Sequence, residues 1–211
     1  TDNGSNSFSF IIPAGYDGAY VTVNFFKDTP NGITSLDQIT DLADTYVLTA
    51  DVDASGFTGK GEFTGKLDGG LHKIYNLSKP LFSSTNGAII RNIIFEDVNI
   101  SSGDGDGDAG AVTSKAKGAT RIYNCGILPT SVERDDKGNI TGFYGSSVGA
   151  THNVGGLVGT LSGTARVINC FSYANITGGA NKGGIVGSNE VTSTQASFTT
   201  MVMNCMFHGE I

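Results

Sequence analysis

An internal repeat constrains the fold of this 211-residue chain more than any other feature of its sequence. Four segments align with one another: 81–103, 110–142, 155–178 and 183–211. One column of the alignment contains only asparagine: Asn92, Asn124, Asn169 and Asn204. The next column contains small or medium apolar residues: Ile93, Cys125, Cys170 and Cys205. The steps between the asparagines are 32, 45 and 35 residues, which is typical of a solenoid whose repeats carry insertions.

The composition of each repeat indicates strands rather than helices. A unit has β-rich pieces, such as residues 165–172 and 174–177, separated by Gly, Ser, Thr and Asn. Strong helix formers at a 3.6-residue spacing are missing, so helical repeats are disfavoured. Short strands that stack on the same strands of the next turn give a parallel β-helix with rungs about 4.8 Å apart. We therefore predict an all-β parallel β-helix solenoid in which each rung buries the apolar face of its neighbours.

The asparagine column is interpreted as a corner of the solenoid. Val167 and Cys170 are both apolar and three residues apart, so a bend between them lets both point inward. Asn169 suits that bend because asparagine tolerates the left-handed backbone conformation, and stacked amides can bond in a ladder. A polar binding stripe is the alternative. The three cysteines are expected to be a buried apolar column, with an accidental disulfide as the alternative.

A further column is expected to contain isoleucine: Ile100, Ile140, Ile176 and Ile211. The segments 128–138 and 142–154 are then insertions in the second repeat. No capping segment follows Ile211, which favours continuation of the natural protein into more repeats.

Residues 1–32 are expected to form a linker and an antiparallel hairpin, which is either a cap or the tail of a preceding domain. The alternation of apolar residues within 7–26 predicts the hairpin. The β-helix is then expected over 33–211. A short capping helix is predicted over 35–44, because Ser35 and Gln38 form a capping box and the apolar residues that follow share one face.

The repeats contain a Gly-Leu-any-Gly core at Gly156-Leu157-Val158-Gly159 and Gly184-Ile185-Val186-Gly187. Weaker copies occur at Leu81-Phe82-Ser83 and Gly110-Ala111-Val112-Thr113. Over residues 33–211 the chain therefore resembles the GLUG-motif repeat proteins. This resemblance implies a β-helix module on the bacterial cell surface. It implies little about activity, because the motif is a packing module that occurs beside many different domains.

The charge of the chain excludes two classes of partner. Its formal net charge is −7 and its pI is about 4.8, whereas nucleic acids and anionic membranes are bound by basic surfaces. No apolar run reaches transmembrane length, so this chain is not expected to insert into a membrane. An extracellular or bacterial cell-surface location is expected, as part of a longer polypeptide. The expected partner is an extracellular glycan or a host or cell-surface protein.

Two groups of residues are candidates for binding. Asp104, Asp106 and Asp108 alternate with glycine, and three such carboxylates can converge on calcium; the alternative is a solvated acidic turn. Phe143, Tyr144 and His152 lie in the second insertion, and insertions in solenoids often form the binding face. The sequence has neither an H-E-x-x-H nor a C-x-x-C motif, so zinc protease chemistry is not indicated.

The sequence predicts a non-catalytic extracellular module: an adhesin, a stalk or a glycan-contacting surface. No catalytic residue is assigned. A polysaccharide lyase or glycosidase of the β-helix type is the alternative, and it needs a cleft with two carboxylates. A further alternative is a repeat fragment of a large surface protease, with the chemistry located outside these residues.

Overall fold

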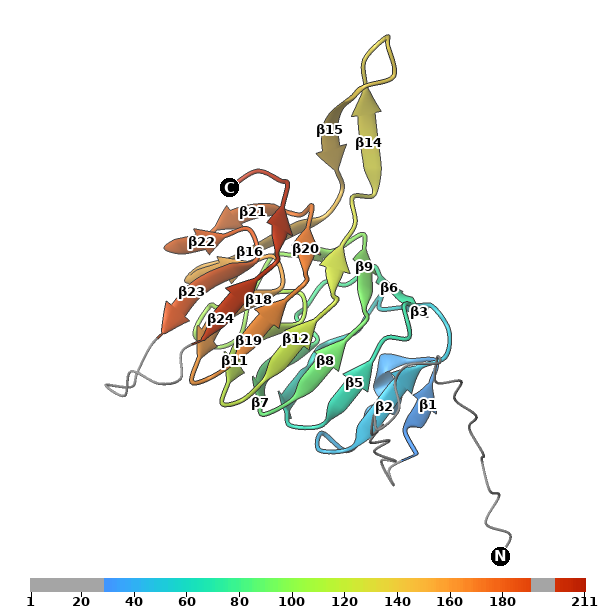
Figure 1. The fold of residues 1–211 in the computed structure, drawn as a ribbon, viewed down its shortest axis with the longest axis vertical. Coiled ribbons are helices and arrows are strands. Elements are labelled where there is room, and N and C mark those ends of the chain that lie inside the picture. The colour runs from blue at the N-terminus through green and yellow to red at the C-terminus, as the bar shows by residue number, and fades with distance from the viewer. Residues whose placement is uncertain (1–28, 191–199) are drawn as a thin grey trace, which may run out of the picture.

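The predicted parallel β-helix is confirmed by the computed structural model, which describes residues 29–190 and 200–211 (Figure 1). The largest sheet has seven parallel strands in the spatial order β1-β2-β5-β8-β12-β19-β24. Their bounds are β1 (Asn31–Ile33), β2 (Thr45–Leu48), β5 (Lys66–Asp68), β8 (Ile89–Arg91), β12 (Arg121–Tyr123), β19 (Arg166–Ile168) and β24 (Met201–Met203). The predicted hairpin within residues 7–26 lies outside the described residues.

Two further parallel sheets form the other long walls of the solenoid. The six-stranded sheet contains β3 (Val52–Asp53), β6 (Lys73–Tyr75), β9 (Ile94–Glu96), β13 (Gly126–Ile127), β20 (Phe171–Ser172) and β25 (Met206–Phe207). The five-stranded sheet contains β4 (Lys60–Phe63), β7 (Phe82–Asn86), β11 (Thr113–Lys117), β18 (Val158–Ser162) and β23 (Val186–Glu190). Among the described residues, no helix is long and apolar enough to cross a membrane.

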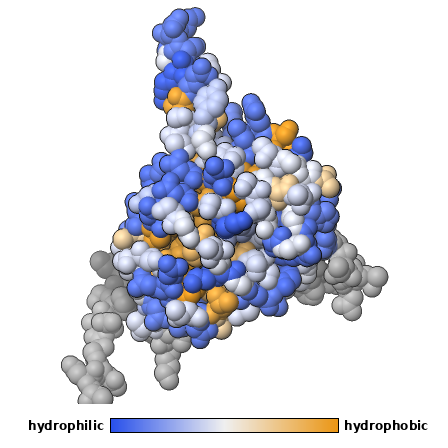
Figure 2. Space-filling model, turned by 180° about the vertical axis from the view of Figure 1, so that it is seen from behind, coloured by the Kyte–Doolittle hydropathy of each residue, from blue (hydrophilic) through white to orange (hydrophobic). Residues whose placement is uncertain are grey.

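Shorter sheets complete the later rungs. A three-stranded sheet contains β10 (Asn99–Ile100), β16 (Ser147–Ala150) and β21 (Asn175–Gly178), and a two-stranded one contains β17 (Asn153–Gly155) and β22 (Asn181–Gly183). Outside the rungs, β14 (Ser131–Arg134) and β15 (Ile140–Tyr144) form an antiparallel hairpin. This hairpin projects from the body, and its tip is hydrophilic (Figure 2).

The asparagine column turns the corner between the seven-stranded and six-stranded sheets, as predicted. All four asparagines have a left-handed backbone, with φ between 52° and 56°. Two neighbouring pairs bond through their side chains: Asn124 Nδ2 donates to Asn92 Oδ1, and Asn204 Nδ2 donates to Asn169 Oδ1, both at 3.2 Å. The left-handed turn lets the residues on either side of each asparagine point into the core.

The core is one continuous column of apolar side chains. Ile90, Ile122 and Val167 stack on successive strands of the seven-stranded sheet and are fully buried. Cys125 and Cys170 are buried beyond the corner, as predicted, whereas Cys205 in the last described rung is only partly buried; the three cysteines are free. A hydrogen bond with Cys125 raises the pKa of the Cys170 thiol to about 12, so this thiol stays protonated. Val202 occupies the same inward column on β24 but is 48% exposed, so the last described rung leaves its apolar face uncovered.

The closing glycine of the Gly-Leu-any-Gly core has a packing role. A Cβ on Gly159 would lie 2.7 Å from the Ala109 nitrogen and 3.0 Å from the Asn153 oxygen. Glycine is therefore needed where β17 passes close to β18. The strand register also corrects the alignment of the second copy, because Thr113 pairs with Val158. This places Ser114 opposite Gly159, one residue later than the sequence alignment predicted.

The helix predicted over 35–44 is wrong in its length. The capping box of Ser35 and Gln38 is present, but only Leu36–Gln38 forms a helix, and it is a 3-10 turn. The Asp41 carboxylate accepts a hydrogen bond from the Ala43 N–H at 2.9 Å. Such a local side-chain bond competes with helix formation. The segment still covers the core in the first turn of the solenoid, since Leu36 and Ile39 are buried.

The isoleucine column is also corrected at one position. Val148 on β16, rather than Ile140, pairs between Ile100 and Ile176. Ile140 lies on the hairpin, where it is 45% exposed and sits opposite Arg134 at a β-bulge. The second repeat therefore has one continuous insertion rather than two.

Candidate functional site

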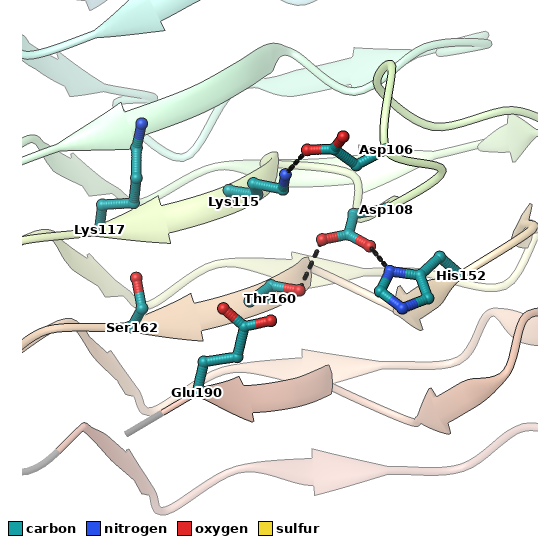
Figure 3. Close-up of a pocket in the computed structure, with 8 residues that line it drawn as sticks. All are labelled: Asp106, Asp108, Lys115, Lys117, His152, Thr160, Ser162 and Glu190. Atoms are coloured by element: carbon teal, nitrogen blue, oxygen red, sulfur yellow. Dashed lines mark hydrogen bonds and ion pairs between the residues drawn. The ribbon is translucent and has the colours of Figure 1, made fainter. Parts of the chain in front are cut away.

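A polar pocket lies on the outer face of the five-stranded sheet and has a volume of about 500 Å³ (Figure 3). Its lining is polar: Asp106, Asp108, Lys115, Lys117, His152, Thr160, Ser162 and Glu190. Strands β11, β18 and β23 supply the floor, because Lys115 pairs with Thr160 and Ser162 pairs with Glu190 in the strand register. The loops before β11 and before β17 supply the aspartates and His152.

The buried carboxylate of Asp108 is the centre of this site. Asp108 is 1% exposed, and its two oxygens face different partners. Oδ1 lies 2.9 Å from His152 Nδ1 and accepts hydrogen bonds from the Asn153 main-chain N–H and Nδ2, at 3.1 and 3.0 Å. Oδ2 accepts a hydrogen bond from the Thr160 hydroxyl at 2.7 Å. These donors replace the water that a buried carboxylate loses.

His152 is fixed by this carboxylate while its ring stays accessible. Its side chain is 52% exposed. A hydrogen on Nδ1 satisfies the carboxylate and leaves Nε2 available to an external partner. Asn153 continues the network, because its Oδ1 accepts a hydrogen bond from Asn181 Nδ2 of the next rung at 2.7 Å. The site is therefore held in place by two consecutive rungs.

The aspartates predicted to bind calcium face different partners. Lys115 pairs with Asp106 and lies 3.6 Å from Asp104, whereas Asp108 bonds to His152 and Thr160. The hydrogen bond and charge of Lys115 lower the pKa of Asp106, and Asp106 in turn raises the pKa of Lys115. No group of three His, Cys, Asp or Glu side chains in ranges 29–190 and 200–211 is placed to hold a metal ion. The structure thus does not bring the three carboxylates together, and calcium binding stays a prediction.

The other predicted binding residues are divided between two places. Phe143 and Tyr144 lie on β15 of the hairpin, and His152 lies in the pocket. The Phe143 ring packs on Tyr173 and His208, with ring centroids 4.6 and 4.5 Å apart. The Tyr144 hydroxyl donates to Glu133 at 2.9 Å, which raises the pKa of Tyr144. A binding role for these three residues stays a prediction.

The residues that organise the pocket around His152 could not be predicted from the sequence. By residue type alone, Asn153, Thr160 and Lys115 resemble the polar residues that occur in any surface strand or loop. Their only sequence signal is position: Lys115 and Thr160 lie at equivalent outward positions of successive repeats, which becomes clear only with the corrected register.

Comparisons with known proteins place the chain beside bacterial proteases. Residues 22–127 match the family described as the M26 IgA1-specific metallo-endopeptidase N-terminal region. An immunoglobulin A1 protease of Streptococcus sanguinis is 39% identical over 144 residues, covering 58% of this chain and 7% of the relative. An immunoglobulin A1 protease of Streptococcus pneumoniae is 29% identical over 218 residues, covering 86% of this chain and 11% of the relative.

The chain therefore spans only about a tenth of the length of these relatives, or less. The matches agree with the prediction that it is part of a longer polypeptide. They also confirm the extracellular or bacterial cell-surface location expected from the sequence.

Proposed function

Because the chain belongs to the family of M26 IgA1-specific metallo-endopeptidase N-terminal regions, we propose that it is a non-catalytic module of a larger bacterial surface protease. In this proposal the module binds immunoglobulin A1, the protein after which its relatives are named. Of the functions predicted from the sequence, this proposal adopts the fragment of a surface protease in place of the adhesin. It keeps the predicted contact with an extracellular protein or glycan.

The metal ion implied by the family description, a metallo-endopeptidase, is not part of the function proposed for this module. Among residues 29–190 and 200–211, no set of three metal-ligating side chains has a suitable arrangement. No step of peptide-bond cleavage is therefore derived from these residues. The module's proposed contribution is binding, and the residues that contribute to it are those of the pocket.

The single observation that carries the proposal is the pre-organised network around Asp108. Asp108, Asn153 and Thr160 are all buried and hydrogen-bonded to one another, so they do not need to reorganise when a ligand arrives. The pocket combines acids and bases at short range, which suits a neutral polar ligand better than an ion. A sugar residue or a polar segment of a glycoprotein has this chemistry.

A second role, as a rigid spacer, is favoured by a different observation. The apolar face around Val202 on β24 is uncovered in the last described rung. A further rung of a longer solenoid would bury it. The similarity to GLUG-motif proteins, which stays a prediction, is compatible with either role.

The test is a binding measurement between the purified chain and immobilised immunoglobulin A1. We expect saturable binding that weakens about tenfold in His152→Ala, since a hydrogen bond to a charged or polar ligand group contributes about 1–1.5 kcal/mol. His72→Ala is the matched control, because His72 also pairs with an aspartate, Asp51, but lies outside the pocket. Binding that is lost equally in both variants, or no binding at all, would reject the pocket as the contact and leave the spacer role.

A further inference from the structure

A second, smaller pocket lies on the side of the solenoid where the five-stranded sheet begins, and it has a volume of about 210 Å³. Its walls come from the start of β4 and the residues just before it, the start of β7 and the loop before it, the acidic loop 101–108 and the start of β11. The residues that line it include two lysines and three hydroxyl side chains: Lys60, Lys79, Thr58, Ser83 and Ser114.

Unlike Lys73, Lys115 and Lys117, the two lysines have no carboxylate partner among the described residues. Lys73 pairs with Glu96 at 2.7 Å and Lys117 pairs with Glu62 at 2.6 Å. Lys60 has no side-chain partner within the described residues, and Lys79 donates to the hydroxyl of Ser102. In a chain of net charge −7, two ammonium groups that lack a carboxylate partner and line one pocket are available for an external anion.

The one acidic side chain of this pocket is already compensated. Asp104 Oδ1 accepts hydrogen bonds from the main-chain N–H groups of Asp106 and Asp108, at 3.1 and 3.0 Å. Its other oxygen lies 3.6 Å from Lys115 Nζ, outside this pocket. The Asp104 carboxylate is thus stabilised by main-chain N–H groups of its own loop and by Lys115. The two lysines therefore leave the pocket with a net positive charge.

An independent observation concerns Ser114. Its side chain is fully buried, and its hydroxyl has no hydrogen-bond partner within the described part of the chain. A buried hydroxyl without a partner is unfavourable, and native proteins rarely retain one unless a ligand or water satisfies it. Ser114 belongs to the wall of the lysine pocket, so an oxygen-rich group bound there could accept its hydrogen.

We propose that this pocket, between Lys60, Lys79 and Ser114, binds the oxyanion group of a ligand: a sulfate, phosphate or carboxylate. The two ammonium groups supply the charge, and the serine hydroxyls supply directional hydrogen bonds to the anion's oxygens. The volume of about 210 Å³ is below the range of about 300–1,000 Å³ that encloses a drug-sized molecule. The pocket therefore fits a charged group rather than a whole oligosaccharide.

The test is a titration of the isotopically labelled 211-residue chain, followed through its amide resonances. Sodium sulfate, phosphate, acetate and glucuronate are added in parallel, with sodium chloride at equal ionic strength as reference. We expect saturable shifts of the Lys60, Ser83 and Ser114 amides with at least one oxyanion. Saturation by the first two salts indicates a tetrahedral group, and saturation by the last two indicates a carboxylate. Shifts that match those in chloride would overturn the proposal.

Three substitutions separate binding from structure. Ser114→Ala should raise the melting temperature without ligand, because it removes a buried unpaired hydroxyl, yet weaken oxyanion binding roughly tenfold or more. Thr120→Val is the matched control: Thr120 is the other buried hydroxyl without a partner in the described ranges, and it does not line the pocket. It should raise the melting temperature and leave binding unchanged. Lys60→Gln should abolish saturation; unchanged affinity in both Ser114→Ala and Lys60→Gln would overturn the proposal.

Discussion

At the scale of single residues, the fold depends on a backbone conformation that most side chains avoid. The corner asparagines have φ values of 52–56°, in the left-handed region that costs roughly 1–2 kcal/mol per ordinary residue. Asparagine reduces this cost because its short polar side chain bonds locally. The hydrogen bond from the Asn124 side-chain amide to that of Asn92 adds a link between rungs. The asparagine column could be predicted from the sequence because every repeat needs a residue that tolerates the left-handed conformation at the same corner.

Substitution of Asn124 tests these two contributions separately. Asn124→Ala should lower the free energy of unfolding by about 2 kcal/mol, through left-handed strain and the lost side-chain bond. Asn124→Gly should lower the free energy of unfolding by only about 1 kcal/mol, through the lost side-chain bond. Glycine adopts positive φ without strain, so the strain contribution is absent. Urea denaturation followed by circular dichroism measures both. Equal losses in the two variants would mean that backbone strain plays no part at this corner.

Acidification tests the start of the same corner, at Asp68. Partial burial opposes ionisation of this carboxyl, but hydrogen bonds from the Gly70 N–H, Asn92 and Arg91 outweigh it and hold its pKa below the ordinary value. A folded-state pKa below the unfolded one stabilises the fold above about pH 4, the unfolded pKa, and this stabilisation disappears as pH falls through the folded pKa.

Asp68→Asn should therefore cost about 1 kcal/mol at pH 7, a value reduced for solvent screening of the pair with Arg91. Its difference from the wild type should shrink as the pH falls below about 4. Urea unfolding at pH 7, 4 and 3 provides the measurement. A difference that stays constant over this range would show that the charge of Asp68 is not the stabilising feature.

At the scale of elements, the hairpin of β14 and β15 is the least integrated part of the described fold. Every residue of β14 is exposed. On β15, the Phe143 ring packs against Tyr173 and His208 of the body. The sequence alignment failed here for a physical reason. Ile140 has the apolar character of a rung residue, but an antiparallel pairing with β14 holds it outside the ladder, and Val148 serves in its place.

Replacement of residues 131–144 by a short Gly-Ser link tests this independence. The body should unfold with a free energy within about 1–2 kcal/mol of the wild type, since the main loss is the aromatic packing of Phe143, worth about 0.5–1.5 kcal/mol per pair. Urea unfolding of the deletion variant and of Phe143→Ala should give similar values. Loss of cooperative unfolding in the deletion alone would show that the hairpin holds the rungs together.

At the scale of the whole molecule, sequence reasoning could predict the fold but little of the site. The fold is repeated in every unit, so columns such as Asn92 to Asn204 reveal it several times. The pocket occurs once: Asp108, His152 and Thr160 come from a loop, a turn and a strand that the solenoid brings together. Nothing in the local sequence of any of the three shows that the other two are its partners.

The parallel stacking has a consequence for length. Seven strands of the largest sheet, spaced about 4.8 Å apart, make a column about 29 Å long. The protein can therefore act as a ruler. A whole added or deleted repeat would change the separation of its two ends in a fixed step, with a small rotation from the sheet twist. An insertion within a repeat, such as the hairpin of β14 and β15, leaves that separation unchanged. The length of the solenoid and the loops on its surface can therefore evolve independently.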